Sequence, residues 1–270
     1  DDNTAVGYAA LGANTTGEYN TAVGYSALKA NTTARDNSAF GYKSLEANTT
    51  GTKNSGYGYQ TLRQATTGNN NTAVGYFALD ANTTASNNTA VGMNCLQQCT
   101  TGASNTGIGS AALDAVTTGS DNTAVGNLAL DAVSTTSETT AVGSYALSNL
   151  TSGVQNVGVG YKALFTNVSS ANNTAVGYKA LEVNTGASNT AVGTKALDEN
   201  TTGAANTAVG DHALDNNTTA SNNTAVGYIA LETNTTGSEL TAVGCEALEA
   251  NTTGGASTAV GFRAIHSNTT

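Results

Sequence analysis

The chain has 270 residues, a net charge of −10, three cysteines and no proline. The negative charge disfavours nucleic acids and anionic membranes as partners, and no apolar run approaches the ~20 residues that a membrane-spanning helix requires. The absence of proline suits an uninterrupted backbone hydrogen-bond ladder, because proline cannot donate to one. The chain opens on Asp1 without a charged and apolar leader, so we expect any secretion signal to have been removed or to lie outside this sequence.

One 17-residue repeat fills the chain. Its consensus is N-T-A-V-G-Y-x-A-L-x-A-N-T-T-G-x-x, and its first glycine occurs sixteen times, always 17 residues apart except for the spacing of 16 from Gly177 to Gly193. We number the columns of the repeat from this glycine, so that the valine before it is column −1 and the tyrosine after it is column +1. Such short units bury their apolar side chains only against the next unit. We therefore expect a single repeat domain over residues 1–270, with no separate cap or anchor domain.

Within each repeat, the N-T-A-V segment predicts a short strand that ends at the glycine corner. The A-L segment predicts a second short strand, and N-T-T-G predicts a second corner. A helix is disfavoured because each unit carries fixed glycines and β-branched residues. At ~3.3 Å per residue each unit makes one coil, and sixteen coils paired in parallel at ~4.8 Å give a rod of roughly 75 Å. The predicted fold is an all-β parallel β-solenoid, or β-roll, of sixteen 17-residue repeats.

Four columns vary little and predict structural residues. Column 0 is always glycine, and column +4 is always aliphatic. Column −1 is Val or Ile except at Phe40 and Tyr57, and column +7 is Asn in most repeats. Representative members are Gly24, Gly75 and Gly227, Leu28, Leu79 and Leu231, Val23, Val74 and Val226, and Asn14, Asn31, Asn48, Asn82, Asn200, Asn234 and Asn251.

The replacements in column +7 indicate that its asparagines point inward. All of them are small or apolar, and four of the five fall in consecutive repeats: Ala65, Cys99, Val116, Val133 and Leu150. In a buried ladder each amide bonds the amides above and below it, and an apolar residue inserted alone strands two partners at a cost of ~1–3 kcal/mol each. Replacing a block of neighbours together confines that cost to the two ends of the block.

The same asparagines create many N-x-S/T sequons. Heavy N-glycosylation of a secreted protein is one interpretation, and the buried ladder, which leaves no room for a glycan, is the favoured one. Exposed corner sites stay open as glycosylation candidates, namely Asn70, Asn87 and Asn222.

An acidic column lies at +5, and several of its members have a basic partner at +2, as in Lys43 with Glu46, Lys179 with Glu182 and Lys195 with Asp198. Asp80, Asp114 and Asp131 have no such partner in column +2. Because Ca²⁺ is bound by oxygen ligands, these three are candidate cation ligands. No known calcium-loop motif is present, so a solvated acidic stripe is the favoured interpretation, and no cofactor is expected beyond this candidate Ca²⁺.

The remaining chemistry-bearing residues predict no active site. His212 and His266 occupy outward columns without a nucleophile and an acid beside them, so we expect the protein not to be an enzyme. Cys95 and Cys99 lie four residues apart, either as two small buried residues or as a local disulfide if their geometry allows. Cys245 is too far along the rod to pair with either.

The N-T-A-V-G core resembles the N-S-V-A-I-G motif in the head repeats of trimeric autotransporter adhesins. It is also similar to the T-A-V-G-Y-x-A-L repeats in stalks of phage tail fibres and related bacterial surface proteins, and Asn20 to Leu28 shows this best. The resemblance covers the whole chain. It implies a parallel β-roll, usually trimeric, on the outside of a cell or virion, that serves display and attachment.

The resemblance also assigns roles to residues. Val23 and Val74 would fill the interior of the roll, while Ala22, Gly24, Ala73 and Gly75 would allow a neighbouring wall to approach closely. The chain departs from the adhesin pattern in its period of 17 and in its Ala-Leu pair, and it has no coiled-coil stalk, membrane barrel or self-cleaving chaperone domain.

The favoured function is a structural or adhesive extracellular fibre at a cell or virion surface. Its expected partner is itself, as a trimer or other lateral oligomer or as a head-to-tail filament joined through uncapped terminal repeats, with host surfaces or glycans as further partners. Two alternatives remain: an ice-binding solenoid that uses a threonine file, and a carbohydrate-binding β-helix. The threonine file comprises Thr15, Thr32, Thr49, Thr66 and Thr83.

Overall fold

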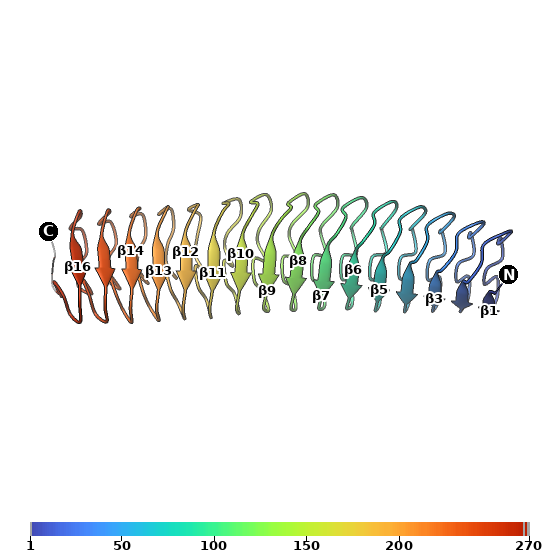
Figure 1. Cartoon of the computed structure of the whole chain (residues 1–270), viewed down its shortest axis with the longest axis horizontal. Helices are drawn as coiled ribbons and strands as arrows, with labels where there is room; N and C mark the ends of the chain where they lie inside the picture. Colours follow the sequence, from blue (N-terminus) through green and yellow to red (C-terminus); the bar gives the residue numbers. More distant parts are fainter. Residues whose placement is uncertain (1, 267, 269–270) are drawn as a thin grey trace. The chain divides into compact units, whose positions relative to one another are not determined.

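The computed structural model describes residues 2–266 and 268. It is all-β, and the chain divides into two compact units, Asp1–Glu138 and Thr139–Thr270. Each unit is a stack of coils with one three-residue strand per coil (Figure 1). Within each unit every strand pairs in parallel with the next strand along the chain. The predicted all-β parallel solenoid is therefore confirmed.

The strands of unit 1 are β1 (Thr4–Val6), β2 (Thr21–Val23), β3 (Ser38–Phe40), β4 (Ser55–Tyr57), β5 (Thr72–Val74), β6 (Thr89–Val91), β7 (Thr106–Ile108) and β8 (Thr123–Val125). Those of unit 2 are β9 (Thr140–Val142), β10 (Val157–Val159), β11 (Thr174–Val176), β12 (Thr190–Val192), β13 (Thr207–Val209), β14 (Thr224–Val226), β15 (Thr241–Val243) and β16 (Thr258–Val260). Over residues 2–266 and 268, no helix has the length and hydrophobicity that crossing a membrane requires.

The prediction of two strands per coil is wrong, because the A-L side of the coil is not extended. In the first repeat, Ala9 and Leu11 have φ values of 55° and 51°, and the same left-handed conformation recurs in columns +2 and +4 of later repeats. Backbone hydrogen bonds between coils nevertheless continue there, as from Leu11 N–H to Ala27 O at 3.0 Å. The ladder therefore persists on this side without strand geometry.

Strand pairing joins residues of the same column. In β5 and β6, Thr72 faces Thr89 and Ala73 faces Ala90. The 16-residue repeat keeps this register, with Thr174 facing Thr190, because its missing residue is one threonine of the N-T-T-G corner. Each side chain therefore stacks on its own equivalent in the next coil.

The interior is filled by alanine and leucine, and the assignment of valine to it is wrong. Leu28, Leu79 and Leu231 are fully buried, as are the alanines of column −2 from Ala22 to Ala242. Val23 is half-buried, and Val74 and Val226 are 37% and 36% exposed. Successive strand residues point to opposite faces, so an inward alanine places the valine that follows it outside.

At Gly56 and Gly107, column −2 has glycine instead of alanine, next to column +3 residues that are larger than alanine. A Cβ built on Gly56 would lie 2.5 Å from Ser44 Oγ and 2.9 Å from Thr61 Oγ1. A Cβ built on Gly107 would lie 2.5 Å from Cys95 Sγ. The interior between these two columns is thus narrow enough for a hydroxyl or thiol to require glycine opposite it.

Column 0 requires glycine for two reasons. Gly75 has a φ of +139°, which side-chain-bearing residues rarely adopt, and a Cβ on it would lie 2.3 Å from Gly92 O in the next coil. Gly24 and Gly227 meet the same obstruction, at 2.3 Å and 2.4 Å. The backbones of successive coils are therefore in close contact along this column.

We expect Gly75→Ala to lower the free energy of unfolding by at least about 3 kcal/mol, since the methyl group adds both backbone strain and a clash with backbone. The matched control is Gly12→Ala, in column +5, where other repeats carry larger side chains such as Lys29. Urea-unfolding midpoints of both variants would test this, and an equal effect of the two changes would contradict it.

Candidate functional site

The asparagines of column +7 form a buried ladder, as predicted. Asn31 Nδ2 donates to Asn14 Oδ1 at 2.9 Å and Asn48 Nδ2 donates to Asn31 Oδ1 at 3.0 Å. In unit 2 the same bond joins Asn234 to Asn217 and Asn251 to Asn234. Most of these amides also donate to the column +10 carbonyl of their own corner, as Asn200 Nδ2 does to Gly203 O at 2.9 Å. The ladder ties each coil to the next and closes each corner.

The ladder is damaged where apolar residues interrupt it, as expected. Asn48 Oδ1 and both polar atoms of the Asn82 side chain are buried without a hydrogen-bond partner, because Ala65 lies between them and Cys99 follows. At another edge of the apolar block, Leu150 offers no amide oxygen to Asn167 Nδ2, which donates to Ser170 O at 3.1 Å. The hydrogen bonds that an interruption removes are thus those of the asparagines on either side of it.

We expect Ala65→Asn to raise the free energy of unfolding by about 1–3 kcal/mol, since the new amide would donate to Asn48 Oδ1 and accept from Asn82 Nδ2. Ala65→Val is the matched control, because valine already occupies this column at Val116 and supplies no hydrogen bond. Urea-unfolding midpoints of both variants measure the difference. Equal midpoints for the Asn and Val variants would contradict the expected gain from the restored hydrogen bonds.

A second asparagine ladder, in column −4, was not predicted. Asn37 N–H donates to Asn20 Oδ1 at 3.1 Å, and Asn54 N–H donates to Asn37 Oδ1 at 2.9 Å. The Nδ2 of Asn37 donates to Gly51 O at 2.9 Å, the same carbonyl that accepts from Asn48. The two ladders therefore share the column +10 carbonyls. The signal available in the sequence was the near-constant Asn before T-A-V-G.

This sharing explains why column +7 tolerates replacement. Where Ala65 stands in that column, Gly68 O still accepts from Asn54 Nδ2 at 2.7 Å. Where Cys99 stands there, its thiol lies 3.2 Å from Gly102 O, in the place of the missing amide donor. A corner carbonyl is thus satisfied by one ladder when the other is broken.

The threonines of column +8 are also committed to the contact between coils. Thr15 Oγ1 donates to Thr32 O at 2.9 Å, and the series continues through Thr32, Thr49, Thr66 and Thr83 at 3.0–3.2 Å. Most of this file is half-buried. Its hydroxyl protons therefore point to backbone oxygens, while the next threonine, in column +9, is exposed in most repeats.

Asp80 has no basic partner in column +2 of its own repeat, where Phe77 stands, but it has one in the preceding coil. Arg63, in the same column one coil earlier, binds it through Nε at 2.7 Å and through a second nitrogen at 3.0 Å. Partners of this kind lie one repeat apart in the sequence. Asp114 and Asp131 each keep one buried oxygen without a hydrogen-bond partner, and burial raises the pKa of both carboxyl groups.

Column +5 also contains Asp215, whose carboxyl group is buried beside Asp198. Burial, and then the charge of Asp198, raise the pKa of Asp215 to about 6, although His212 opposes the shift. The pKa of Asp198 is likewise raised by burial. Between pH 4 and 6 the folded chain therefore holds a proton at Asp215 that the unfolded chain has released.

We expect the protein to gain stability as the pH falls from 7.5 to 5, because the folded state binds more protons than the unfolded state over that interval. Asp215→Asn removes the titrating group, so the variant should be more stable than the parent at pH 7.5 and should respond less to pH. Urea midpoints at several pH values measure both effects, and an unchanged pH response would refute the assignment.

The predicted pairs between columns +2 and +5 are confirmed. Lys43 Nζ lies 3.4 Å from Glu46, Lys179 Nζ lies 2.8 Å from Glu182 and Lys195 Nζ lies 3.5 Å from Asp198. Because these groups are partly exposed, solvent screens each pair and its contribution to stability is small.

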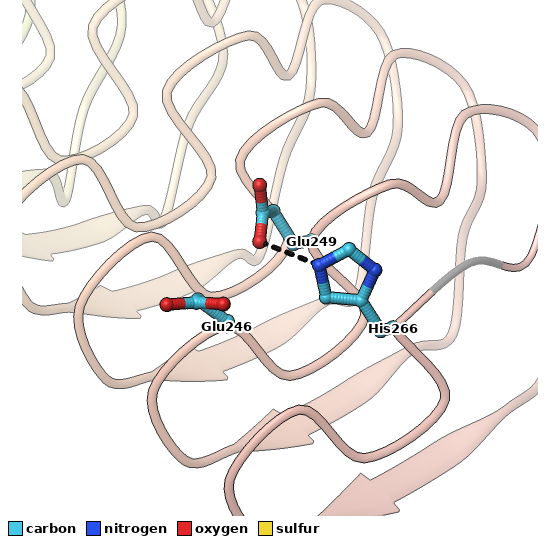
Figure 2. Close-up of side chains that lie close together, drawn as sticks. All are labelled: Glu246, Glu249 and His266. Carbon is cyan, nitrogen blue, oxygen red and sulfur yellow. Dashed lines mark ion pairs between the residues drawn. The ribbon is translucent and has the colours of Figure 1, made fainter.

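An additional cluster was missed at the end of unit 2. Glu246, Glu249 and His266 converge from two successive coils (Figure 2). His266 Nε2 lies 3.0 Å from Glu249 Oε2, and Arg263 forms an ion pair with Glu246. The signal was a glutamate in column +2, where other repeats place a lysine, followed by a histidine in column +5 of the next repeat.

The cysteines are free thiols. Cys95 and Cys99 are buried and do not form the disulfide that was one of their two interpretations. Burial raises the pKa of Cys95 to about 12 and that of Cys99 to about 11, so both stay protonated near neutral pH. Cys245 is partly exposed.

The corner asparagines Asn70, Asn87 and Asn222 are exposed and have left-handed backbone conformations. Asn70 Nδ2 donates to Asn87 Oδ1 at 3.2 Å, so neighbouring corner side chains touch. The ladder asparagines of the N-T-T sequons are instead engaged inside the coils.

The outer side of the strands carries a threonine-rich, a valine-rich and a tyrosine-rich column with almost no charge. We call columns −3, −1 and +1 the outer face. In unit 1 no residue of these columns is charged, and in unit 2 Asp211 is the charged exception. Five tyrosines of column +1 stack with ring centroids 5.0–5.4 Å apart and ring planes within 15° of parallel. They are Tyr8, Tyr25, Tyr42, Tyr59 and Tyr76.

A scan against protein-family models and a search of the curated proteins each returned no match for this chain.

Proposed function

We propose that this chain is a structural element of an extracellular fibre at a cell or virion surface, and that copies associate side by side through the outer face. The observation that carries the proposal is the distribution of charge. The chain has a net charge of −10, yet the outer face has no charged residue in unit 1. The extracellular setting is supported only by the resemblance of the repeat to adhesin and tail-fibre repeats.

The outer face has the composition of a surface that packs against another. Val74, Val91 and Ile108 are 36–42% exposed, and Phe40 and Tyr57 stack in the same column. Aligned exposed apolar side chains lose unfavourable contact with water when they are covered. Two copies that meet on this face bring no like charges together in unit 1, whereas contact through the acidic column would do so.

A repeated face also selects a partner with the same spacing. Side chains on the outer face recur at the distance between coils, so the ridges of a second copy fit between them along the whole contact. A second copy has this periodicity and the same lack of charge. Lateral association of copies therefore satisfies both the shape and the charge of the surface.

The alternatives receive less support. The threonine file suggested for ice binding is mostly half-buried, and its hydroxyls donate to backbone oxygens. Sugar binding to tyrosine uses an open ring face, whereas the stacked tyrosines cover the faces of their neighbours. We therefore place lateral association first.

We expect the parent chain to be oligomeric in size-exclusion chromatography with light scattering, and Val74→Glu with Val91→Glu to weaken association at least tenfold. The two new carboxylates would be buried without partners at the contact. Thr67→Glu with Thr84→Glu is the matched control, since it adds the same charge in exposed column +9. A monomeric parent chain, or equal effects of the two double variants, would contradict the proposal.

A further inference from the structure

The cluster formed by Glu246, Glu249 and His266 is set apart from the other charged positions by its ligand types (Figure 2). Glu246 and Glu249 occupy columns +2 and +5 after β15, and His266 occupies column +5 after β16. One ligand atom from each residue lies within 4.8 Å of the others, and all three residues are partly buried. Two carboxylates and one imidazole thus converge between neighbouring coils.

In several other repeats, a lysine in column +2 lies beside the carboxylate of column +5. Lys179 Nζ lies 2.8 Å from Glu182 Oε2, and the lysines at 43 and 195 occupy the same position in their repeats. After β15 the base is replaced by Glu246, so the acidic column faces a second carboxylate there. Arg263 pairs with Glu246 and balances one of the two negative charges.

We propose that Glu246, Glu249 and His266 bind one Zn²⁺ ion, which takes the place that lysine ammonium groups occupy in other repeats. An imidazole nitrogen with two carboxylate oxygens suits zinc, whereas Ca²⁺ prefers oxygen ligands alone. Two ligands bonded at ~2.1 Å to a tetrahedral zinc ion lie ~3.4 Å apart, within a few tenths of an ångström of the separation in this cluster. His266 Nε2 and Glu249 Oε2 are separated by 3.0 Å.

The ion joins two coils. Glu246 and Glu249 come from one coil and His266 from the next, so the bound metal is a cross-link in addition to the backbone ladder. Glu246 reaches it by a side-chain rotation that keeps one oxygen on Arg263, and water fills the remaining coordination positions. This inference does not depend on the proposed lateral association, because the three residues lie outside the outer face.

Isothermal titration of the full chain with Zn²⁺, after treatment with a chelator, tests the site. We expect one high-affinity Zn²⁺ per chain and no comparable binding of Ca²⁺. Glu249→Gln and His266→Gln should each weaken Zn²⁺ binding at least tenfold. Arg263→Gln should strengthen it, because the guanidinium competes with the ion for Glu246.

Matched controls separate this site from other surface ligands. Glu46→Gln changes the same column in unit 1, and His212→Gln removes the other histidine, so both variants should bind Zn²⁺ like the parent chain. Unfolding in the absence of metal verifies that each variant is folded, and Zn²⁺ should raise the unfolding midpoint of the parent but not of His266→Gln. Absence of Zn²⁺ binding by the parent, or binding that survives both Glu249→Gln and His266→Gln, would overturn the proposal.

Discussion

The close stacking of identical backbone positions is the constraint on which this structure depends. At column 0 the backbone of one coil lies so near the next that a Cβ on Gly24 would come within 2.3 Å of Gly41 O. In-register stacking at that distance makes each side chain the neighbour of its own equivalent. A residue type is therefore suited to a column when it can bond or pack against itself.

Asparagine meets this requirement inside the coils because its amide carries both a donor and an acceptor. Two asparagine ladders use it differently, one through amide-to-amide bonds and one through amide-to-backbone bonds, and they meet at shared corner carbonyls such as Gly51 O. Threonine meets it through a hydroxyl bond to the next backbone, and tyrosine through ring stacking. The buried polar groups of the coil are thus largely satisfied within the stack.

Carboxylates cannot pair with themselves, and the acidic column shows the consequence. Asp80 forms an ion pair with Arg63, and Glu182 forms ion pairs with Lys162 and Lys179. The pKa values of three other members of the column are instead raised by burial, namely Asp114, Asp131 and Asp215. The cluster after β15 extends the same logic, since a stacked pair of acids favours a cation between them. The outer face of unit 1, by contrast, carries no charged residue, and the proposed association rests on this difference.

The sequence by itself determined the repeat, the parallel solenoid and the inward direction of the column +7 asparagines, because these follow from period and from substitution within one chain. The three-dimensional structure decided what depends on neighbouring coils or on backbone conformation. Val74 lies on the outside because Ala73 points inward. The expected second strand is absent because residues such as Leu79 have a left-handed backbone conformation. The three-dimensional structure also brought together partners one repeat apart, as in Arg63 with Asp80 and His266 with Glu249, which comparison within a single repeat does not reveal.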